Sequence, residues 1–156
     1  MTLFLDDFLV WDFWLAPRLS ASEPFHCYFL QAPRSLPDPE MRHDQARIGH
    51  ATSTNLVDWE YHGLILPLGA RGDWDDWTQW TGSVIRYEGT NYLFYTGRSK
   101  SEPVNVQRIG LAVSDDLFRW QKAPQNPVVQ AVNPWYEAPA TDGSNRSDCR
   151  DPWIVR

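Results

Sequence analysis

The feature that most constrains this chain is an internal repeat. The segment IGHATSTNLVDW, which begins at Ile48, matches the segment IGLAVSDDLFRW, which begins at Ile109, at an offset of 61 residues. Six of the twelve positions are identical without a gap. Each copy has the pattern of a short strand, a polar turn and a tryptophan that begins another strand. Self-similarity of this kind indicates an array of similar supersecondary units.

The repeat extends upstream of these two segments. The aromatic stretches HCYFLQAP and NYLFYTGRS each precede one copy, and the openings VWDFWLAP, WTGSVIRY and RDPWIVR stand before them. The three openings are centred on Asp12, Gly82 and Asp151, which are 70 and 69 residues apart. Each unit therefore holds four strands in about 70 residues, as one blade of a β-propeller with long loops does. No helical periodicity is sustained over a useful length.

The predicted fold class is all-β, a β-propeller of which this chain holds about two blades and the first strand of a third. The first blade is expected over residues 8–78, the second over 79–148, and the opening strand of a third over 149–156. Two blades and one strand cannot close a ring, and an unpaired strand edge seeks a partner. We therefore expect this chain to be the N-terminal portion of a larger propeller, or to self-associate or pair with a second chain that completes it.

Charge and hydropathy exclude several function classes. The net charge is −6 and no basic cluster occurs, which argues against a nucleic-acid or anionic membrane partner. No apolar stretch reaches the length of a membrane helix. The N-terminal segment carries acidic residues and no basic start, so we predict no signal peptide and a cytoplasmic protein.

Neither a metal nor a cofactor is predicted. Cys27 and Cys149 are far apart in the sequence, and two free thiols are the favoured reading. The four histidines lack paired ligand spacing, and a packing or pocket-edge role is favoured for His50. No phosphate loop or dinucleotide fingerprint is present.

The spacing of the repeat predicts that several polar and aromatic residues face one cavity. In a propeller the first strand of each blade lines the central channel, so Asp12, Trp80, Thr81 and Asp151 are expected around one cavity. A single aspartate at a strand start is commonly a turn or cap residue, but both aspartates hold the same place in successive units. Two carboxylates and tryptophans facing one cavity suit carbohydrate chemistry, because indoles stack on sugars and carboxylates bind hydroxyls or attack an anomeric carbon.

These motifs resemble a known family. IGHATSTNLVDWE resembles the GHA-S-DLVHWE segment of glycoside hydrolase family 32, the invertases, inulinases and levanases. WTGSV resembles the Trp/Phe-Ser-Gly-Ser-Ala motif of that clan, and CRDP resembles its Arg-Asp-Pro motif. VWDFWLAP departs from the family 32 nucleophile motif Asn-Asp-Pro-Asn-Gly and is closer to the Val-Trp-Asp-x-Trp-Pro of family 68, the levansucrases. Both families share a five-bladed propeller, so the resemblance implies that the fold is a β-propeller of the five-bladed glycosidase type and that the chain is part of its catalytic domain.

The resemblance implies roles for six residues. Asp12 would be the nucleophile, and Asp151 would hold two sugar hydroxyls and stabilise the oxocarbenium-like transition state. Arg150 would hydrogen-bond the sugar and keep Asp151 ionised by its opposite charge. The walls of the subsite would be Trp11 and Trp80, and Thr81 would replace the family serine that contacts the nucleophile or the sugar.

The family's third essential residue, an acid/base glutamate, lies in a later blade. None of the glutamates after Asp12 begins a first strand: Glu23, Glu40, Glu60, Glu88, Glu102 and Glu137. General acid catalysis contributes about 10²–10⁴-fold, so this chain alone is expected to bind fructosyl units weakly and to turn over poorly.

The predicted function is retaining hydrolysis of β-fructofuranosides, either sucrose or a fructan. Hydrolysis is favoured over transfer because the family 32-like features outnumber the family 68-like ones. Two alternatives stay open: a non-catalytic carbohydrate-binding or assembly module, and an arabinose- or xylose-directed five-bladed glycosidase, against which the Arg-Asp-Pro motif argues. The polar segment over residues 31–47 is either a rim loop that shapes acceptor choice or a plain solvated loop.

Overall fold

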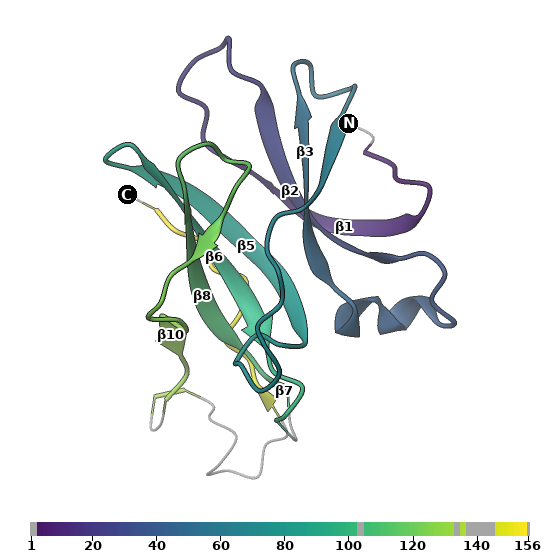
Figure 1. The fold of residues 1–156 in the computed structure, drawn as a ribbon, viewed down its shortest axis with the longest axis vertical. Helices are drawn as coiled ribbons and strands as arrows, with labels where there is room; N and C mark the ends of the chain where they lie inside the picture. Colours follow the sequence, from purple (N-terminus) through teal and green to yellow (C-terminus); the bar gives the residue numbers. More distant parts are fainter. Residues whose placement is uncertain (1–2, 103–104, 133–134, 137–145, 156) are drawn as a thin grey trace.

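Two antiparallel sheets stand side by side and make up most of the protein (Figure 1). The computed structural model describes residues 3–102, 105–132, 135–136 and 146–155. The helical part of these residues is one 3₁₀ segment, η1 (Pro39–Asp44). The predicted fold class, an all-β chain built from propeller-type blades, is confirmed.

The first sheet is a four-stranded meander in which each strand pairs with the next. Its order is β1-β2-β3-β4, and every pairing is antiparallel. The bounds are β1 (Phe8–Leu15), β2 (Phe25–Pro33), β3 (Arg47–Ser53) and β4 (Glu60–Leu64).

The second sheet repeats this plan. Its strands are β5 (Thr78–Tyr87), β6 (Thr90–Arg98), β8 (Arg108–Ser114), β9 (Gln121–Lys122) and β10 (Val129–Gln130), with both β9 and β10 paired to β8. A small parallel pair joins β7 (Asn105–Val106) to β11 (Arg146–Ser147). The first strands of the two meanders, β1 and β5, contact each other.

The expected opening strand over residues 149–156 differs from the structure. Residues 148–155 have no regular secondary structure. A strand exists only within a hydrogen-bonded ladder, and among the described residues no strand forms a ladder with this segment. Instead, the backbone N–H of Asp151 donates to a side chain, the hydroxyl of Thr96.

The polar turn of the repeat explains two of its identical positions. The Ser53 hydroxyl accepts the backbone N–H of Leu56 at 2.8 Å, and the Ser114 hydroxyl accepts that of Leu117 at 2.9 Å. Both leucines adopt the left-handed conformation, with φ of 62° and 66°. A serine side chain that satisfies the backbone of a tight turn is the local reason for the shared Ser-x-x-Leu spacing.

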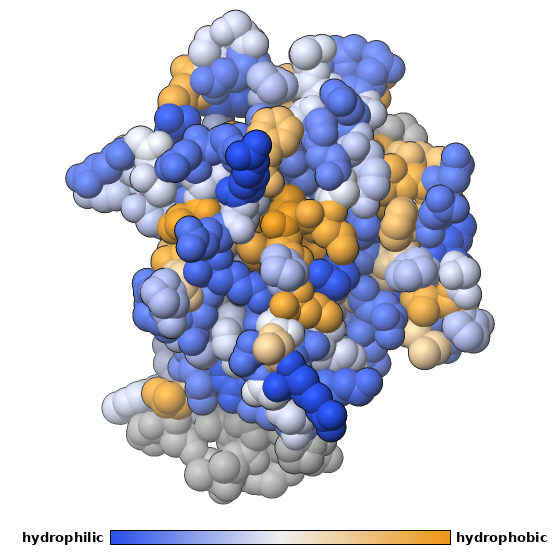
Figure 2. Space-filling view, in the orientation of Figure 1, coloured by the Kyte–Doolittle hydropathy of each residue, from blue (hydrophilic) through white to orange (hydrophobic). Residues whose placement is uncertain are grey.

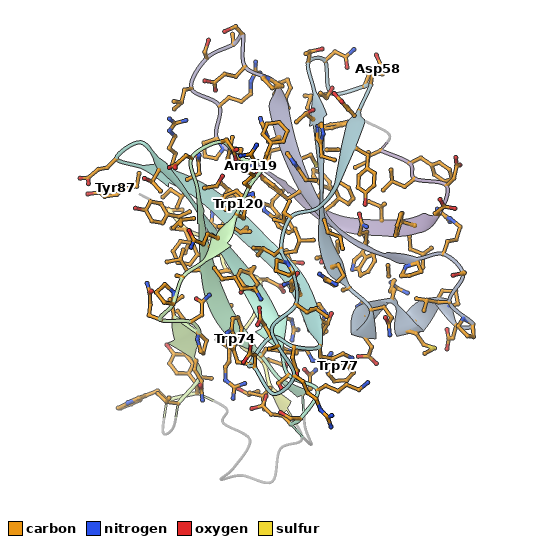
Figure 3. The ribbon with its side chains drawn as sticks, viewed as in Figure 1. Asp58, Trp74, Trp77, Tyr87, Arg119 and Trp120 are labelled. Carbon is orange, nitrogen blue, oxygen red and sulfur yellow. The ribbon has the colours of Figure 1, made fainter. Side chains whose placement is uncertain are left out.

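The main core lies between the sheets and is formed by aromatic and aliphatic side chains of both. The hydroxyl of Tyr28 in β2 donates to the carbonyl of Leu117 at 2.7 Å, and its ring meets Trp120 edge-on at 5.8 Å. Figure 3 shows Trp120 at this seam, and in Figure 2 apolar side chains gather in the middle of the same face. Burying each large apolar side chain contributes about 1.5–3 kcal/mol, so this packing holds the two sheets together.

A histidine stack lies across this seam. The Nδ1 of His26 and the Nε2 of His50 are 3.0 Å apart, and the ring of Tyr28 stacks on His50 at 4.8 Å. Phe118, from the turn after β8, meets His26, His50 and His62 edge-on at 5.0–5.2 Å. His50 therefore has a packing role. Among the described residues, no group of three or more histidine, cysteine or acidic side chains is arranged to hold a metal ion.

Acid is expected to destabilise the fold through this stack. Burial, followed by the neighbouring His26 and His62, lowers the pKa of His50 to about 3, and burial and then His62 lower that of His26. The charges of Glu23 and Asp116 oppose this shift at His26, and that of Asp116 opposes it at His50. The unfolded chain binds protons near the ordinary value of 6.5, so stability is complete above that pH and is lost as the pH falls toward 3.

The expected slope is up to about 1.4 kcal/mol per pH unit for each such histidine. Urea unfolding at pH 7.0, 6.0 and 5.0 measures it, and His50→Gln should flatten the dependence. The same exchange at His43, outside the stack, controls for the loss of a histidine as such. Equal slopes in the wild type and His50→Gln would contradict the assignment.

Cys27 and Cys149 are unpaired thiols. Within the described residues, no helix has the length and apolar character needed to cross a membrane.

Candidate active site

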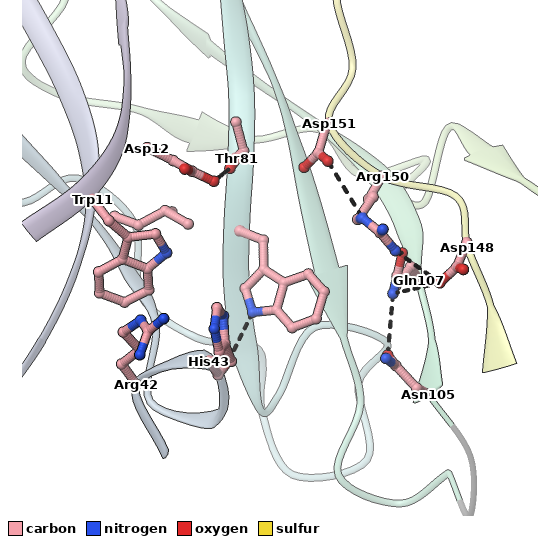
Figure 4. Close-up of a pocket in the computed structure, with 12 residues that line it drawn as sticks. Trp11, Asp12, Arg42, His43, Thr81, Asn105, Gln107, Asp148, Arg150 and Asp151 are labelled. Carbon is pink, nitrogen blue, oxygen red and sulfur yellow. Dashed lines mark hydrogen bonds and ion pairs between the residues drawn. The ribbon is translucent and has the colours of Figure 1, made fainter. Parts of the chain in front are cut away.

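A cavity of about 490 Å³ opens between the first strands of the two sheets (Figure 4). Residues from β1, β5 and η1 line it, together with residues around β7 and the segment over residues 148–151. The six residues predicted from the sequence all belong to this lining: Trp11, Asp12, Trp80, Thr81, Arg150 and Asp151. Residues from opposite ends of the chain therefore meet at one site, while their chemical roles stay predictions.

Two matched β-bulges place Asp12 and Thr81. The ladder between β1 and β2 shifts between Trp11 and Phe13, and that between β5 and β6 shifts between Trp80 and Gly82. A bulge leaves one residue unpaired and re-aims its side chain. The structural equivalent of Asp12 is thus Thr81, one residue before the Gly82 on which the sequence repeat was centred.

Both bulges carry local constraints. Asp12 has a φ of 34°, a conformation that aspartate tolerates better than most residues. At Gly82, a Cβ atom would lie 2.2 Å from the carbonyl oxygen of Phe94, so the strand requires glycine there. The hydroxyl of Thr81 donates to Oδ2 of Asp12 at 2.8 Å and orients that carboxylate.

The Trp80 wall of the cavity is held from two sides. Its indole N–H donates to the carbonyl of His43 at 2.8 Å, and the guanidinium of Arg98 lies 4.7 Å from its ring centroid. Arg98 also lies 4.4 Å from the ring centroid of Trp77 and forms an ion pair with Asp44 at 3.2 Å. These contacts dock η1 against β5 and fix the indole plane.

The residues that η1 contributes were not predicted as site residues. Arg42 and His43 line the cavity, and the guanidinium of Arg42 lies 5.9 Å from the ring centroid of Trp11. The signal was present at Asp38, whose side chain caps the first turn by accepting the N–H of Glu40 at 2.9 Å. A capping residue followed by proline is a helical start, so this part of the segment over residues 31–47 is a structured rim rather than a plain loop.

Arg150 is shared between two carboxylates. Its Nη1 lies 2.7 Å from Asp148, whereas its Nε lies 3.4 Å from Asp151 (Figure 4). The buried side chain of Gln107 accepts from Arg150 at 3.2 Å and donates to Asp148 at 3.3 Å. Sequence reasoning missed Asp148, Gln107 and the neighbouring Asn105, because these polar residues follow no motif spacing.

The electrostatic balance at Asp151 differs from the expectation. Arg150 was expected to keep this carboxyl ionised, and it does lower the pKa of Asp151. Partial burial of the carboxyl outweighs that effect, and the charge of Asp12 adds to the increase, so the net pKa is raised. Arg150 is also closer to Asp148 than to Asp151, with contacts of 2.7 Å and 3.4 Å.

Comparison with known proteins identifies the family. The model of the family described as "Glycosyl hydrolases family 32 N-terminal domain" matches residues 19–156. The chain belongs to glycosyl hydrolases family 32. The resemblance found in the sequence motifs is therefore confirmed. The WTGSV and CRDP motifs lie within the matched residues and contribute Trp80, Thr81, Arg150 and Asp151 to the lining of the cavity.

Individual relatives agree with this family 32 assignment. An insoluble isoenzyme of beta-fructofuranosidase from Arabidopsis thaliana is 34% identical over 110 residues, which cover 66% of this chain and 17% of that protein. The levanase of Bacillus sp. strain L7 is 28% identical over 156 residues, which cover 89% of this chain and 15% of that protein. The chain thus spans less than a fifth of these relatives.

Solved structures show the same fold. The inulosucrase of Halalkalicoccus jeotgali, bound to kestose, superposes with a TM-score of 0.59 at 26% identity, covering 76% of this chain and 32% of that chain. The fructan 1-exohydrolase IIa of Cichorium intybus gives a TM-score of 0.57 at 23% identity, covering 71% and 20%.

Proposed function

We propose that the protein containing this chain is a β-fructofuranosidase that hydrolyses sucrose or a fructan with retention of configuration. The observation that carries the proposal is the cavity that Asp12, oriented by Thr81, and Asp151 line together with two tryptophans. Membership of family 32 supports the same proposed activity.

Asp12 is the nucleophile in the proposed mechanism. A carboxylate oxygen attacks the anomeric carbon of the fructosyl unit, the bond to the glycosidic oxygen breaks, and a covalent fructosyl-enzyme ester forms. Water then attacks the same carbon and releases Asp12 as a carboxylate. The hydrogen bond from Thr81 to Oδ2 keeps the carboxylate in one orientation during both steps.

Asp151 and Arg150 hold the sugar in the proposal. The Asp151 carboxylate accepts hydrogen bonds from two ring hydroxyls and faces the positive charge that develops at the anomeric centre. It does this only when ionised, so its raised pKa places the acid limb of activity above that of an ordinary aspartate. Trp11 and Trp80 cover the apolar faces of the fructosyl unit.

The leaving oxygen still requires a proton donor. No glutamate is among the described residues that line the cavity. We therefore propose that the acid/base is contributed from outside the described residues, at about 5 Å from Asp12 as retention requires.

Product analysis tests the proposal. The purified natural-length protein is incubated with sucrose and with inulin in water containing methanol. We expect release of fructose together with methyl β-fructofuranoside, which reports retention. Turnover of arabinosides or xylosides alone, an inverted methyl glycoside, or fructan binding without any release would each reject the proposal in favour of a different function.

A further inference from the structure

A fully buried hydroxyl, that of Thr96, lies between β5 and the segment that carries Asp151. Thr96 of β6 pairs with Trp80 of β5 and has no exposed surface. Its Oγ1 donates to the carbonyl of Thr81 at 3.1 Å and accepts the backbone N–H of Asp151 at 3.0 Å. One side chain therefore joins β5 to the segment that carries Asp151.

This hydroxyl completes a chain of hydrogen bonds across the cavity. Oδ2 of Asp12 accepts from the hydroxyl of Thr81, the carbonyl of Thr81 accepts from Thr96, and Thr96 accepts from the N–H of Asp151. Asp151 belongs to no described strand, and its φ of 56° lies in the left-handed region. Such a conformation persists where surrounding contacts impose it, and the bond to Thr96 is one such contact.

The first sheet supplies an internal comparison. Trp11 of β1 pairs with Leu30 of β2 just as Trp80 of β5 pairs with Thr96 of β6. Leu30 is 2% exposed and packs in the core, so the meander itself does not require a hydroxyl at this position. A buried hydroxyl costs free energy unless it is hydrogen-bonded. The two hydrogen bonds of Thr96 are made to the backbone of Thr81 and of Asp151, and both residues line the cavity.

We propose that Thr96 is a positioning residue that sets the place of Asp151 relative to Asp12. The inference rests on the proposed function, because it gives the two carboxylates a geometry that the reaction must use. Displacement of a reacting group by about 1 Å costs about 10²-fold in rate, so loss of this bridge should lower the rate of the chemical step.

Two variants of Thr96 separate the hydroxyl from the shape of the side chain. Thr96→Val removes the hydroxyl at constant volume, and Thr96→Ser keeps it. We expect Thr96→Val to lower kcat for sucrose by about 10- to 100-fold, with a smaller change in KM, and Thr96→Ser to restore kcat. The matched control is Thr52→Val, which removes a hydroxyl 2.7 Å from Nε2 of His62, away from the cavity, and should leave kcat unchanged.

Crystal structures of the natural-length wild type and Thr96→Val give a readout independent of activity. We expect the N–H of Asp151 to leave its wild-type position and its φ to change. If the wild type releases no fructose from any donor, the proposed function fails and these structures alone decide the role of Thr96. The inference is overturned by an unchanged Asp151 in a folded Thr96→Val protein, by an unchanged kcat, or by equal losses in Thr96→Ser and Thr96→Val.

Discussion

Replacement of Asp12 with asparagine is expected to lower the kcat for fructose release by more than about 10³-fold. Asparagine has nearly the same shape, and its carbonyl oxygen still accepts the hydrogen bond that Thr81 donates to Oδ2. The amide is a poor nucleophile, so it cannot form the glycosyl ester on which retention depends. Steady-state rates with sucrose, measured for both proteins at one pH, give the ratio.

A matched exchange isolates the nucleophile from a general effect of charge. Asp7→Asn removes a carboxylate five positions earlier, at an exposed residue outside the cavity. This control should keep the wild-type rate, whereas Asp12→Asn should also lose the methyl fructoside formed in the presence of methanol. Full activity of Asp12→Asn would remove Asp12 from the mechanism while leaving the fold and the family intact.

The repeat in the sequence predicted the parts of the site that lie on regular strands. Asp12 and Thr81 occupy corresponding places in two similar meanders, and the chain path of such units brings first strands together. The repeat aligned Asp12 with Gly82, whereas its structural equivalent is Thr81. The error of one residue arises because the position of a bulge depends on hydrogen bonds between strands, which the sequence does not show. The sequence marks the bulge only indirectly, through the glycine that the close approach to Phe94 requires.

Residues whose roles come from long-range pairing escaped prediction. Arg42 and His43 enter the cavity because Arg98, more than fifty residues away, pairs with Asp44 and stacks on Trp80. No spacing rule connects such partners in a single sequence. The same reason applies to Asp151, where burial and the charge of the distant Asp12 outweigh Arg150 and raise the pKa.

A second network of this kind leads to the largest expected effect on stability. Asp75, in the loop before β5, is 2% exposed and accepts hydrogen bonds from the hydroxyl of Tyr95 at 2.9 Å and from Nζ of Lys122 at 2.5 Å. Lys122 lies in β9, so the ion pair ties the start of β5 to the far side of the second sheet. The positive charge of Lys122 offsets the free-energy cost of burying the Asp75 carboxylate.

Lys122→Met is therefore expected to lower the free energy of unfolding by about 3 kcal/mol, at the low end of the range for breaking a buried pair because Lys122 is partly exposed. Equilibrium urea unfolding measures this loss. The control Lys100→Met removes an exposed lysine and should change stability by less than about 0.5 kcal/mol.

The double variant Asp75→Asn/Lys122→Met tests the cause of that loss. Removing the carboxylate charge leaves no uncompensated ion in the interior, so part of the lost stability should return. A loss that is equal in the single and double variants would assign the effect to the packing of the lysine stem instead. Because β5 carries Trp80 and Thr81 a few residues after this loop, the pair anchors the strand that forms one wall of the cavity.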